Sequence, residues 1–581
     1  MLECFIFAKT IRKRACMKKI PFIIFLLIFS SFNATAQVEK ANYRSPLNIP
    51  LLLSANFGEL RPNHFHSGID LKTEGVINKP VFAIEDGYVS RIFVSPSGYG
   101  LALYVNHPRT GQMSLYGHLE RFGPAIANYV KERQNKLERF NVDLYPDKSL
   151  FPIKKGDLIA YSGNSGSSGG PHVHFEIRDL KSGITLDPLI HYKPEIRDTL
   201  SPALKGIAVY GIDRQGVVNG KTAAYHSIQR SKNGDYMAIP ATTVWGRIGI
   251  GVYSNDRMNA TSNIYGVKIV RLYCDGEMIF QSDIKDVNFA TTRMINSLID
   301  FDYWSKKKVF YMKSFVEPGN RLPIYKAKNG GYVDVNEERE YTLKYELEDL
   351  YGNQTEYTFK VLGKRQEIEE QQVCAQYMVW HEDNYYINDS FSLIIPKNNL
   401  YKDICFTLQH DTSAIYSADI YKVNDSYVPL HGYCDMKIKL AKDSLENKSH
   451  YGIIRIDGQK ISWVGGTYKN GTVVARIREL GHTYTVGSDS KVPVITPLNP
   501  TKWVANKSIK IKLTDDLSGI ASFRGTIDGK FALFEHDTKS AVYTYTFDST
   551  RFPQTGKTRK LRFTAKDACG NTTSYEYDFL Y

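Results

Sequence analysis

The sequence predicts a mainly β protein built from several domains. Its 581 residues are too many for one hydrophobic core, and domains of about 100–200 residues predict three to five units. Aromatic residues make up 13% of the chain, with 39 Tyr and 29 Phe, a composition that favours strands over helices. Charged residues at 23% and hydrophobic residues at 42% are ordinary values for globular proteins, which excludes a wholly disordered chain.

Residues 1–36 have the pattern of a secretory signal peptide. Lys18 and Lys19 precede the apolar run 22–29, and small residues at 34–36 offer a cleavage site. Met17 is an alternative start of the chain. No apolar run reaches 18 residues, so we expect no transmembrane segment in the mature chain. The pattern predicts an exported protein, located in the periplasm, in the cell envelope or outside the cell.

The net charge of +13 is spread along the chain, and this distribution argues against a nucleic-acid partner. Six basic residues and one acid lie in residues 1–36, and the remaining 68 basic and 60 acidic residues are spread without a basic run. A mild excess of this kind suits an anionic polymer such as the cell wall. Five cysteines follow residue 36, too few and too scattered for a disulfide scaffold. We expect either no disulfide or a single bridge within the group Cys374, Cys405 and Cys434.

The first domain is predicted over residues 37–195. It alternates short strands with Gly-rich turns, and the strands are expected at 81–84, 88–94, 101–105 and 113–118. An insert over residues 122–152 interrupts this pattern. Apolar residues at 126, 129 and 130 give the insert a helical period over 125–133. Because it follows His118, we expect this insert to cap a groove, restrict the substrate or bind a partner.

An internal repeat divides the rest of the chain. Three turn motifs recur in the same order in residues 196–363 and 489–581, and both segments are predicted to be β-sandwich-like domains. The motifs begin at Asp198 and Asp489, at Cys274 and Ile527, and at Asp349 and Asp567. Asp349, Asp515, Asp516 and Asp567 suggest calcium, but they lack the spacing of a known calcium loop, so turn formation is the favoured interpretation. Residues 364–488 are predicted to be a polar, helical linker followed by a β-rich domain of unknown role.

The chemistry-bearing residues fall into two histidine clusters of the first domain. His64, His66 and Asp70 form the first cluster, and His172, His174 and Glu176 form the second. In a strand, residues two apart share a face, so His172 and His174 can meet at one small ion. Imidazole and carboxylate ligands favour zinc, one ion per chain, with a fourth position left for water. Asp70, four residues after His66, is the best-placed carboxylate.

Three motifs carry a resemblance to a known family. Residues 66–70, 116–118 and 170–176 occur in that order and resemble the lysostaphin/LytM-type zinc metalloendopeptidases, which cleave peptidoglycan cross-bridges. The resemblance covers about residues 50–190. It implies an antiparallel β-sheet with a groove and a metal triad of His66, Asp70 and His174. It also implies two catalytic histidines that are not ligands, here His118 and His172.

The remaining candidates have weaker claims. His64 shares a strand face with His66 but has no carboxylate four residues on, so it is a rival ligand or an outer partner of the site. Glu176 is either an acceptor that orients a ligand imidazole or a residue with a plain surface or salt-bridge role. His107 lies in a predicted hairpin turn, where we expect a surface role. The Gly-rich run 163–170 lacks the Gly-Lys-Ser/Thr ending of a phosphate loop, which excludes nucleotide binding there.

The sequence therefore predicts an exported zinc endopeptidase that hydrolyses peptide cross-links of bacterial peptidoglycan. Its partners are expected to be peptidoglycan peptide stems or cross-bridges, with cell-wall or envelope proteins as candidates for the β domains. One alternative is a non-catalytic LytM-like scaffold that activates another cell-wall hydrolase. A second alternative is a secreted metalloprotease that acts on protein substrates.

Overall fold

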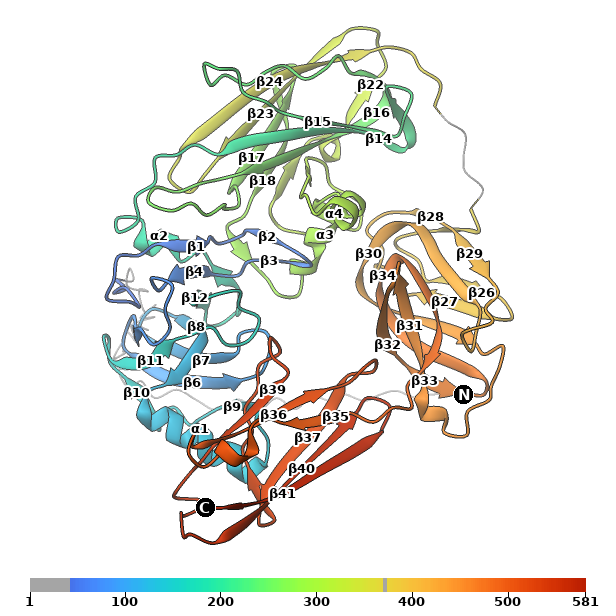
Figure 1. The fold of residues 1–581 in the computed structure, drawn as a ribbon. Coiled ribbons are helices and arrows are strands. Elements are labelled where there is room, and N and C mark those ends of the chain that lie inside the picture. The colour runs from blue at the N-terminus through green and yellow to red at the C-terminus, as the bar shows by residue number, and fades with distance from the viewer. Residues whose placement is uncertain (1–41, 369–373) are drawn as a thin grey trace, which may run out of the picture. The chain divides into compact units, whose positions relative to one another are not determined.

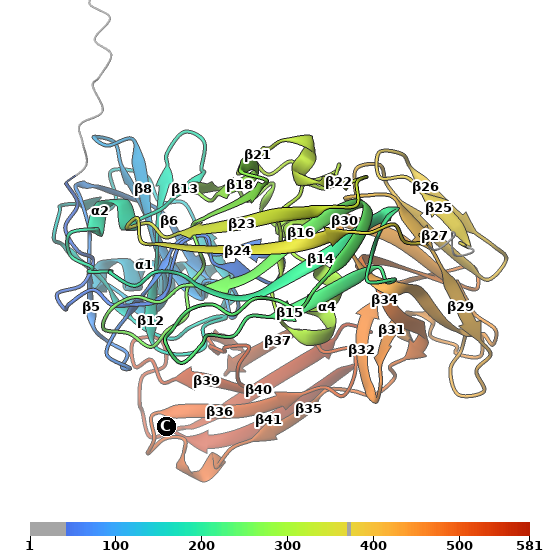
Figure 2. The same ribbon diagram turned by 90° about the horizontal axis from the view of Figure 1, so that it is seen from above.

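Antiparallel β-sheets dominate the computed structural model, which describes residues 42–368 and 374–581 (Figures 1 and 2). The predicted signal peptide, residues 1–36, lies outside the described residues. In the part of the chain that the structure describes, no helix is both long enough and apolar enough to cross a bilayer. The predicted mainly β fold is confirmed.

The histidine motifs lie in a twelve-stranded sheet, whose central strands follow one another in the order β1-β4-β12-β8-β7-β6-β10. Alternating buried residues along these strands pack into a core that includes Ile69, Leu71 and Phe175. A short hairpin of β2 (Leu60–Arg61) and β3 (His64–Phe65) precedes β4. The sheet comprises β1 (Leu53–Ala55), β4 (Ile69–Lys72), β5 (Pro80–Phe82), β6 (Gly87–Val94), β7 (Leu101–His107), β8 (Gln112–Phe122), β9 (Val142–Leu144), β10 (Pro152–Ile153), β11 (Leu158–Ser162), β12 (His172–Asp179), β13 (Thr185–Leu186) and β19 (Asp286–Val287).

The insert contains the predicted helix. Helix α1 (Pro124–Leu137) begins with a proline in its first turn, a position that needs no backbone N–H donor, and ends at Glu138 in the left-handed conformation. It buries Ile126 and Val130, two of the residues whose period predicted it. The two other elements of the insert, β9 and β10, both pair with β6. Most of the insert is therefore packed into the domain as helix and sheet.

The second β segment forms a ten-stranded sheet in which a parallel pair, β16 with β24, joins otherwise antiparallel strands. Figure 2 shows β23 and β24 side by side along most of their length. Strand β19, which lies in this part of the sequence, pairs with β13 and belongs to the twelve-stranded sheet, so this segment contributes one strand to that sheet. The segment contains β14 (Ala203–Val218), β15 (Ala223–Ser227), β16 (Thr243–Asn255), β17 (Ile269–Cys274), β18 (Glu277–Asp283), β20 (Met312–Lys313), β21 (Tyr325–Ala327), β22 (Val333–Val335), β23 (Glu340–Glu348) and β24 (Gln354–Gly363), with helices α2 (Leu189–Tyr192), α3 (Ile295–Leu298) and α4 (Phe301–Lys307) before or within it.

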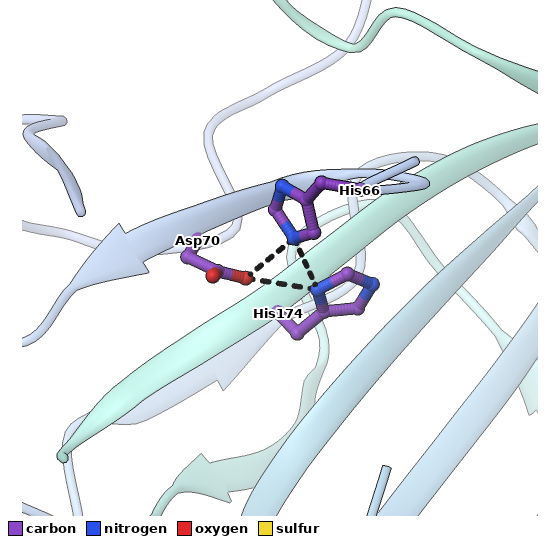
Figure 3. A group of neighbouring side chains, drawn as sticks. All are labelled: His66, Asp70 and His174. Atoms are coloured by element: carbon purple, nitrogen blue, oxygen red, sulfur yellow. Dashed lines mark hydrogen bonds and ion pairs between the residues drawn. The ribbon is translucent and has the colours of Figure 1, made fainter. Parts of the chain in front are cut away.

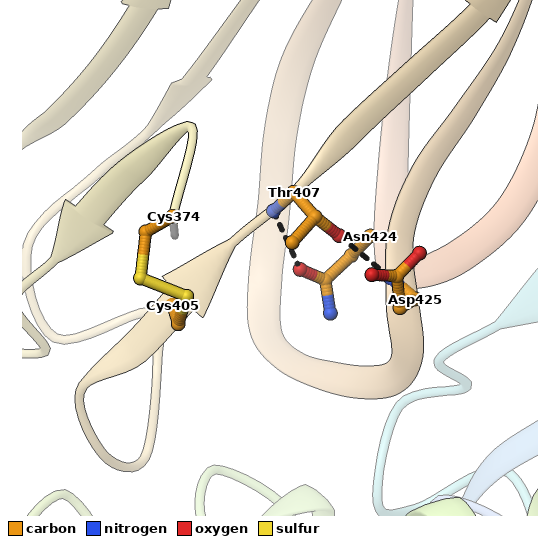
Figure 4. Close-up of a disulfide and its surroundings, with 5 residues drawn as sticks. All are labelled: Cys374, Cys405, Thr407, Asn424 and Asp425. Carbon is orange, nitrogen blue, oxygen red and sulfur yellow. Dashed lines mark hydrogen bonds between the residues drawn. A yellow bond between two sulfur atoms is a disulfide. The ribbon is translucent and has the colours of Figure 1, made fainter. Parts of the chain in front are cut away.

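The third segment has a core of its own under an eight-stranded sheet. The expected helix in the linker is wrong for residues 364–368, which have no helical structure, and the rest of the linker lies outside the described residues. A disulfide joins Cys374 to Cys405 beside the β25–β28 pair (Figure 4), and Cys434 is buried and unpaired. The strands are β25 (Gln376–Met378), β26 (Asn384–Ile387), β27 (Phe391–Ile395), β28 (Ile404–Phe406), β29 (Leu408–Asp411), β30 (Ile420–Lys439), β31 (Tyr451–Asp457), β32 (Lys460–Gly465), β33 (Thr467–Lys469) and β34 (Thr472–Ser488).

The C-terminal segment consists of two sheets around a separate core that includes Trp503 and Phe563. Three strands form one sheet and four form the other, the arrangement expected of a small sandwich. The strands are β35 (Val494–Pro497), β36 (Ser508–Thr514), β37 (Ile520–Ile527), β38 (Lys530–Ala532), β39 (Val542–Thr546), β40 (Thr558–Asp567) and β41 (Thr572–Leu580).

Candidate metal centre

Two neighbouring strands bring three of the predicted residues together. Asp70 lies on β4, His174 lies on β12, and the two are direct partners in the antiparallel ladder. His66 follows β3 and points at both, as Figure 3 shows. All three side chains are buried, with 3–5% of each residue exposed. The sheet register therefore places two imidazoles and one carboxylate at a single point.

One atom of each side chain faces the same small volume. His66 Nε2 lies 3.1 Å from Asp70 Oδ1 and 3.0 Å from His174 Nδ1, and the last two atoms are 2.8 Å apart. Tetrahedral zinc with bond lengths of about 2.0–2.1 Å holds its ligand atoms about 3.3 Å apart. The observed separations fit that value to within about 0.5 Å. Two imidazoles in the donor set favour zinc over calcium or magnesium.

Hydrogen bonds fix the proton of each ligand imidazole on the far nitrogen. His66 Nδ1 donates to the Asn56 carbonyl over 2.7 Å, and His174 Nε2 donates to Glu176 Oε1 over 2.8 Å. Each ring therefore turns its other nitrogen toward the shared point, the orientation that metal ligation requires. Asp70 Oδ2, the oxygen that faces away, accepts from Arg61 Nη2 at 3.1 Å.

Glu176 is buried in a polar network and is not a surface charge. Its side chain is 0% exposed and accepts hydrogen bonds from the Ser67 and Tyr99 hydroxyls, each at 2.7 Å. Arg178 Nε donates to its second oxygen at 2.6 Å. Burial raises the pKa of Glu176, but Arg178 and His174 outweigh burial and lower that pKa to about 2. Glu176 therefore stays ionised and holds the His174 ring.

The charges of the site set the protonation of His174 in the absence of metal. Burial lowers the pKa of His174, but hydrogen bonds and charges from Asp70 and Glu176 outweigh it and raise that pKa to about 9. The pKa of Asp70 is held well below its usual range, because the surrounding histidines outweigh its burial. A metal ion that binds here replaces the proton that His174 otherwise carries.

His118 and His172 lie beside the three-residue group, each with one nitrogen committed to a backbone carbonyl. His118 Nδ1 donates to the Ser165 carbonyl and His172 Nδ1 to the Gly170 carbonyl, both over 2.8 Å. The ring centres of the pair are 4.8 Å apart. His172 Nε2 is buried without a hydrogen-bond partner among the described residues and lies 3.5 Å from Asp70 Oδ1. Both rings therefore have Nδ1 held by a backbone carbonyl, which leaves Nε2 as the nitrogen not used in that bond.

His118 has an unusual backbone and an unusual pKa. Its φ of 57° lies in the left-handed region, which few residues other than glycine adopt, and its N–H donates to the Tyr99 carbonyl at 2.8 Å. Burial, followed by the neighbouring His174 and His172, lowers the pKa of His118 to about 3. The ring is therefore neutral at neutral pH. Strained backbone of this kind is concentrated at functional sites.

A groove of about 630 Å³ runs past the cluster. His118, His172 and Asp70 line it together with Glu59 and Arg61. Residues 167–171 form another wall of the groove. The insert 122–152 contributes no lining residue, so the expectation that it caps the groove is wrong for this cavity. Pairing of β9 and β10 with β6 holds those parts of the insert within the sheet.

Glycines in the motifs have different physical roles. A Cβ on Gly68, between His66 and Asp70, would lie 2.3 Å from the Phe175 carbonyl oxygen, so β4 and β12 can approach only with glycine there. A Cβ on Gly169 would meet nothing within 4 Å. Gly68 therefore serves strand packing, whereas Gly169 leaves the groove open.

Several residues of the site carry no recognisable sequence signal. Asn56 acts through its backbone carbonyl, and its side chain exchanges two hydrogen bonds with the backbone of Gly266, each 2.9 Å long. The second β segment thereby holds the carbonyl that orients His66. Tyr99 lies far from both histidine motifs in the sequence. Ser67 lies inside the first motif, where its place beside His66 is the one available signal.

Two of the remaining histidines lie away from the cluster. His64 is exposed, and its Nδ1 lies 2.9 Å from the Pro62 carbonyl. The expected surface role of His107 is wrong, because this residue is 0% exposed. Its Nδ1 contacts the Asp86 carbonyl and its Nε2 contacts Ser114 Oγ, at 3.0 and 2.8 Å. The side chain points inward at the end of β7, and these partners satisfy both nitrogens.

Comparisons with known proteins match separate parts of the chain. A Zu5-like domain model matches residues 375–489. The chain is 31% identical over 150 residues to an uncharacterised metalloprotease of Haemophilus influenzae, which is 26% of this chain and 25% of that protein. It is 29% identical over 113 residues to the DD-carboxypeptidase/endopeptidase Mpg of Neisseria meningitidis serogroup B, 19% of this chain and 20% of that protein. The chain thus spans a quarter or less of the length of these relatives.

Solved structures give a similar match. The catalytic domain of the M23 protein EnpA from Enterococcus faecalis is 25% identical, with a TM-score of 0.18, and the match covers 24% of this chain and 89% of that one. The catalytic domain of lysostaphin from Staphylococcus simulans is 22% identical, with a TM-score of 0.18 and the same coverage. Part of the chain is thus similar to a metalloprotease and to a DD-carboxypeptidase/endopeptidase, in agreement with the resemblance that the histidine motifs predicted.

Proposed function

We propose that the chain is an exported zinc endopeptidase that hydrolyses peptide cross-links of bacterial peptidoglycan. The observation that carries the proposal is the set of three converging ligand atoms, with both imidazoles oriented by outer hydrogen bonds. Two further imidazoles with Nε2 available stand beside that set, on the wall of a groove. Similarity to a curated DD-carboxypeptidase/endopeptidase supports the choice of substrate class.

His66, Asp70 and His174 would hold the zinc ion through Nε2, Oδ1 and Nδ1. Zinc bound there would polarise the scissile carbonyl and make a water molecule acidic enough to attack it at neutral pH. Glu176 and the Asn56 carbonyl keep the two ligand rings in the required orientation. The protein thereby supplies a prearranged site and does not depend on the substrate to build one.

His172 and His118 would act in proton transfer during the attack of water on the peptide bond. His172 Nε2 is buried, has no hydrogen-bond partner among the described residues and lies near Asp70, so it is placed to accept a proton from the attacking water. His118 shares the groove wall, and because its neutral ring donates from Nδ1 to Ser165, its Nε2 is a second candidate to accept the proton of the attacking water. Protonated His172 would then return its proton to the leaving amine. The division of roles between these two residues is part of the proposal.

Positively and negatively charged side chains both line the groove and could contact a peptide substrate. Arg61 and Lys72 line it with Glu59 and Glu74, so carboxylates and amines of a stem peptide can each find a partner. Burial raises the pKa of Glu59 to about 7, with the charge of Arg61 opposing and that of Asp70 adding to the rise. A groove of this chemistry suits a polar peptide better than an apolar one.

The test is digestion of purified sacculi by residues 37–581, followed by mass spectrometry of the released fragments. We expect new peptide termini at one type of cross-link, and no release by a His174→Ala variant that folds normally. Casein and a Gly-rich peptide, offered in parallel, separate the cell-wall enzyme from a general protease. Efficient cleavage of casein with intact sacculi would reject the proposed substrate. Intact substrates throughout, with zinc bound, would favour the non-catalytic scaffold.

A further inference from the structure

Three buried carboxylates meet in the second β segment, away from the histidine cluster. Asp198 precedes β14, Asp256 follows β16, and Asp349 follows β23. One oxygen from each lies within 4.8 Å of the others. The three residues are 7%, 1% and 4% exposed, respectively. Carboxylates this close and this buried repel one another and lose hydration unless a proton or a cation joins them.

Two of these carboxylates have an oxygen without a donor. Asp198 Oδ2 and Asp256 Oδ1 are buried and have no hydrogen-bond partner among the described residues. Within the described ranges, no lysine or arginine forms an ion pair with any of the three. Burial raises the pKa of Asp198 to about 6 and that of Asp256 to about 8, with Asp349 adding to both. In the described structure no cationic side chain neutralises these carboxylates, although backbone N–H groups donate to Asp198 and Asp349.

Asp349 is already held in position by the turn around it. Its Oδ1 accepts from the N–H groups of Tyr351 and Asn353, at 2.8 and 2.9 Å, and its Oδ2 accepts from Asn353 Nδ2 at 2.7 Å. Asp567, its repeat equivalent, accepts the same three kinds of bond from Cys569 and Asn571. The predicted turn role thus describes both residues. Asp198 Oδ1 likewise accepts from the Leu200 N–H at 3.1 Å, so the oxygens that the turns leave without a donor are Asp198 Oδ2 and Asp256 Oδ1.

The C-terminal repeat contains a second acidic group whose members are mostly satisfied by protein donors. Asp489 accepts from the N–H groups of Lys491 and Ser518 through different oxygens, at 3.1 and 2.9 Å. Asp516 is exposed and pairs with the Lys491 ammonium at 2.6 Å. In the described structure, Asp515 Oδ1 is the one buried carboxylate oxygen of this second group that has no hydrogen-bond donor. This group is the internal comparison for the buried one.

We propose that Asp198, Asp256 and Asp349 bind one calcium ion. All three ligands are hard oxygen donors, with no imidazole or thiolate in the group, and calcium prefers such ligands. Calcium–oxygen bonds of about 2.3–2.6 Å place ligand oxygens up to about 5 Å apart. The observed spacing lies within that range. Backbone carbonyls and water complete the six to eight ligands that calcium takes, as is usual at such sites.

The calcium site would anchor a loop that supports the histidine cluster. The backbones of Asp256 and Tyr265 exchange two hydrogen bonds across the loop, at 2.9 and 3.0 Å. The Tyr265 hydroxyl then donates to the Leu53 carbonyl at 2.8 Å. The next residue, Gly266, holds the side chain of Asn56, whose carbonyl orients His66. Calcium at Asp256 would therefore stiffen the path from the β segment to the peptidase sheet.

The experiment measures binding of radioactive ⁴⁵Ca²⁺ by equilibrium dialysis, with zinc-loaded protein of residues 37–581. We expect about one equivalent of calcium on the unaltered chain, and Mg²⁺ should compete weakly because it prefers smaller octahedral sites. Asp256→Asn, which removes a charge at nearly constant size, should weaken binding at least tenfold. Asp516→Asn is the matched control in the other acidic group and should leave the affinity unchanged.

Thermal unfolding of the same proteins gives a second readout. Calcium at about a hundred times its dissociation constant should raise the melting temperature of the unaltered chain by about 5–10 °C, and that of Asp516→Asn equally. Asp198→Asn replaces Asp256→Asn if the latter fails to fold. No bound calcium on the unaltered chain would overturn the proposal. The same holds for equal calcium affinity in the unaltered chain and in a folded Asp256→Asn or Asp198→Asn variant.

Discussion

His174 donates a hydrogen bond from Nε2 to Glu176 Oε1 across 2.8 Å, and the two residues share one face of β12. Because Nε2 is engaged by Glu176, Nδ1 is the nitrogen that faces Asp70 Oδ1, also 2.8 Å away, and that a metal ion would bind in place of a proton. The two-residue period of a strand thus supplies both a metal ligand and the acceptor that orients it. Ser67, Tyr99 and Arg178 fix that acceptor in turn.

Replacing Glu176 with Gln should weaken zinc binding without removing a ligand. The amide is neutral, so it loses its ion pair with Arg178 and no longer favours the orientation of His174 as strongly. Outer partners of metal ligands are worth about 10–100-fold in metal affinity, and we expect a loss in that range. Competition with a chromophoric chelator measures the affinity.

Asp179→Asn is the control for this variant, because Asp179 ends the same strand and its carboxylate accepts hydrogen bonds from the N–H and hydroxyl of Ser182, away from the histidines. Its zinc affinity should equal that of the unaltered protein. Unchanged affinity in Glu176→Gln would mean that the hydrogen bond does not position the ring.

Substitutions of the histidines should separate ligands from catalysts. His66→Ala and His174→Ala should each lose zinc and activity together. His172→Ala should retain zinc and lose about 10²–10⁴-fold in rate, the usual contribution of a positioned acid–base group. His64→Ala is the control and should be nearly neutral for both, because His64 is exposed beside Pro62. Zinc content by atomic absorption and muropeptide release are measured on each folded variant.

The assignment would be wrong if His172→Ala emptied the site while His174→Ala retained zinc. In that case β12 would present the other imidazole to the ion. His118→Ala should behave like His172→Ala, since both line the groove and neither belongs to the three-residue group.

Zinc binding should release protons at neutral pH. In metal-free protein the pKa of His174 is raised to about 9, because Asp70 and Glu176 outweigh the effect of burial. Below that pH, zinc must displace the proton, so the apparent zinc affinity should rise with pH from 6 to 8 and level off near 9. Calorimetric titrations in buffers of different ionisation enthalpy count the protons. Zinc affinity that stays constant across this range contradicts the assigned protonation.

Gly68→Ala should destabilise the domain and weaken zinc binding. The added methyl group would collide with the Phe175 carbonyl, which lies 2.3 Å from the new atom, and would push β4 away from β12. Gly169→Ala, a glycine in open space, should unfold like the unaltered protein. Thermal unfolding followed by circular dichroism compares the two. Equal melting temperatures for both variants would show that the strands can separate at little cost.

The sequence contains enough information to predict the grouping of His66, Asp70 and His174. Strand periodicity places His172 and His174 on one face without choosing between them, and the resemblance to the lysostaphin/LytM-type family supplied the choice of His174 with His66 and Asp70. The helix at 124–137 was predictable for the same reason, since Ile126 and Val130 recur at a helical period. Periodicity depends only on residues close together in the sequence, so it can be recognised without knowledge of the tertiary fold.

Residues that act through the backbone or across long separations could not be predicted in this way. Asn56 contributes a carbonyl, which every residue has, and its partner Gly266 comes from another segment. His107 looked like a turn residue, because the buried partners Asp86 and Ser114 are determined by the tertiary fold. Asp256 could not be predicted as part of a cluster, because its carboxylate neighbours Asp198 and Asp349 lie far from it in the sequence, next to other strands.

The central claim is that one zinc ion at His66, Asp70 and His174 supports peptidoglycan hydrolysis. The most direct measurement is the rate of fragment release from purified sacculi as zinc is added in steps to metal-free protein. The account predicts that activity rises linearly and levels off at one equivalent of zinc, and that His174→Ala stays inactive throughout. Full activity in thoroughly metal-free protein, or a plateau reached equally by His174→Ala, would contradict it.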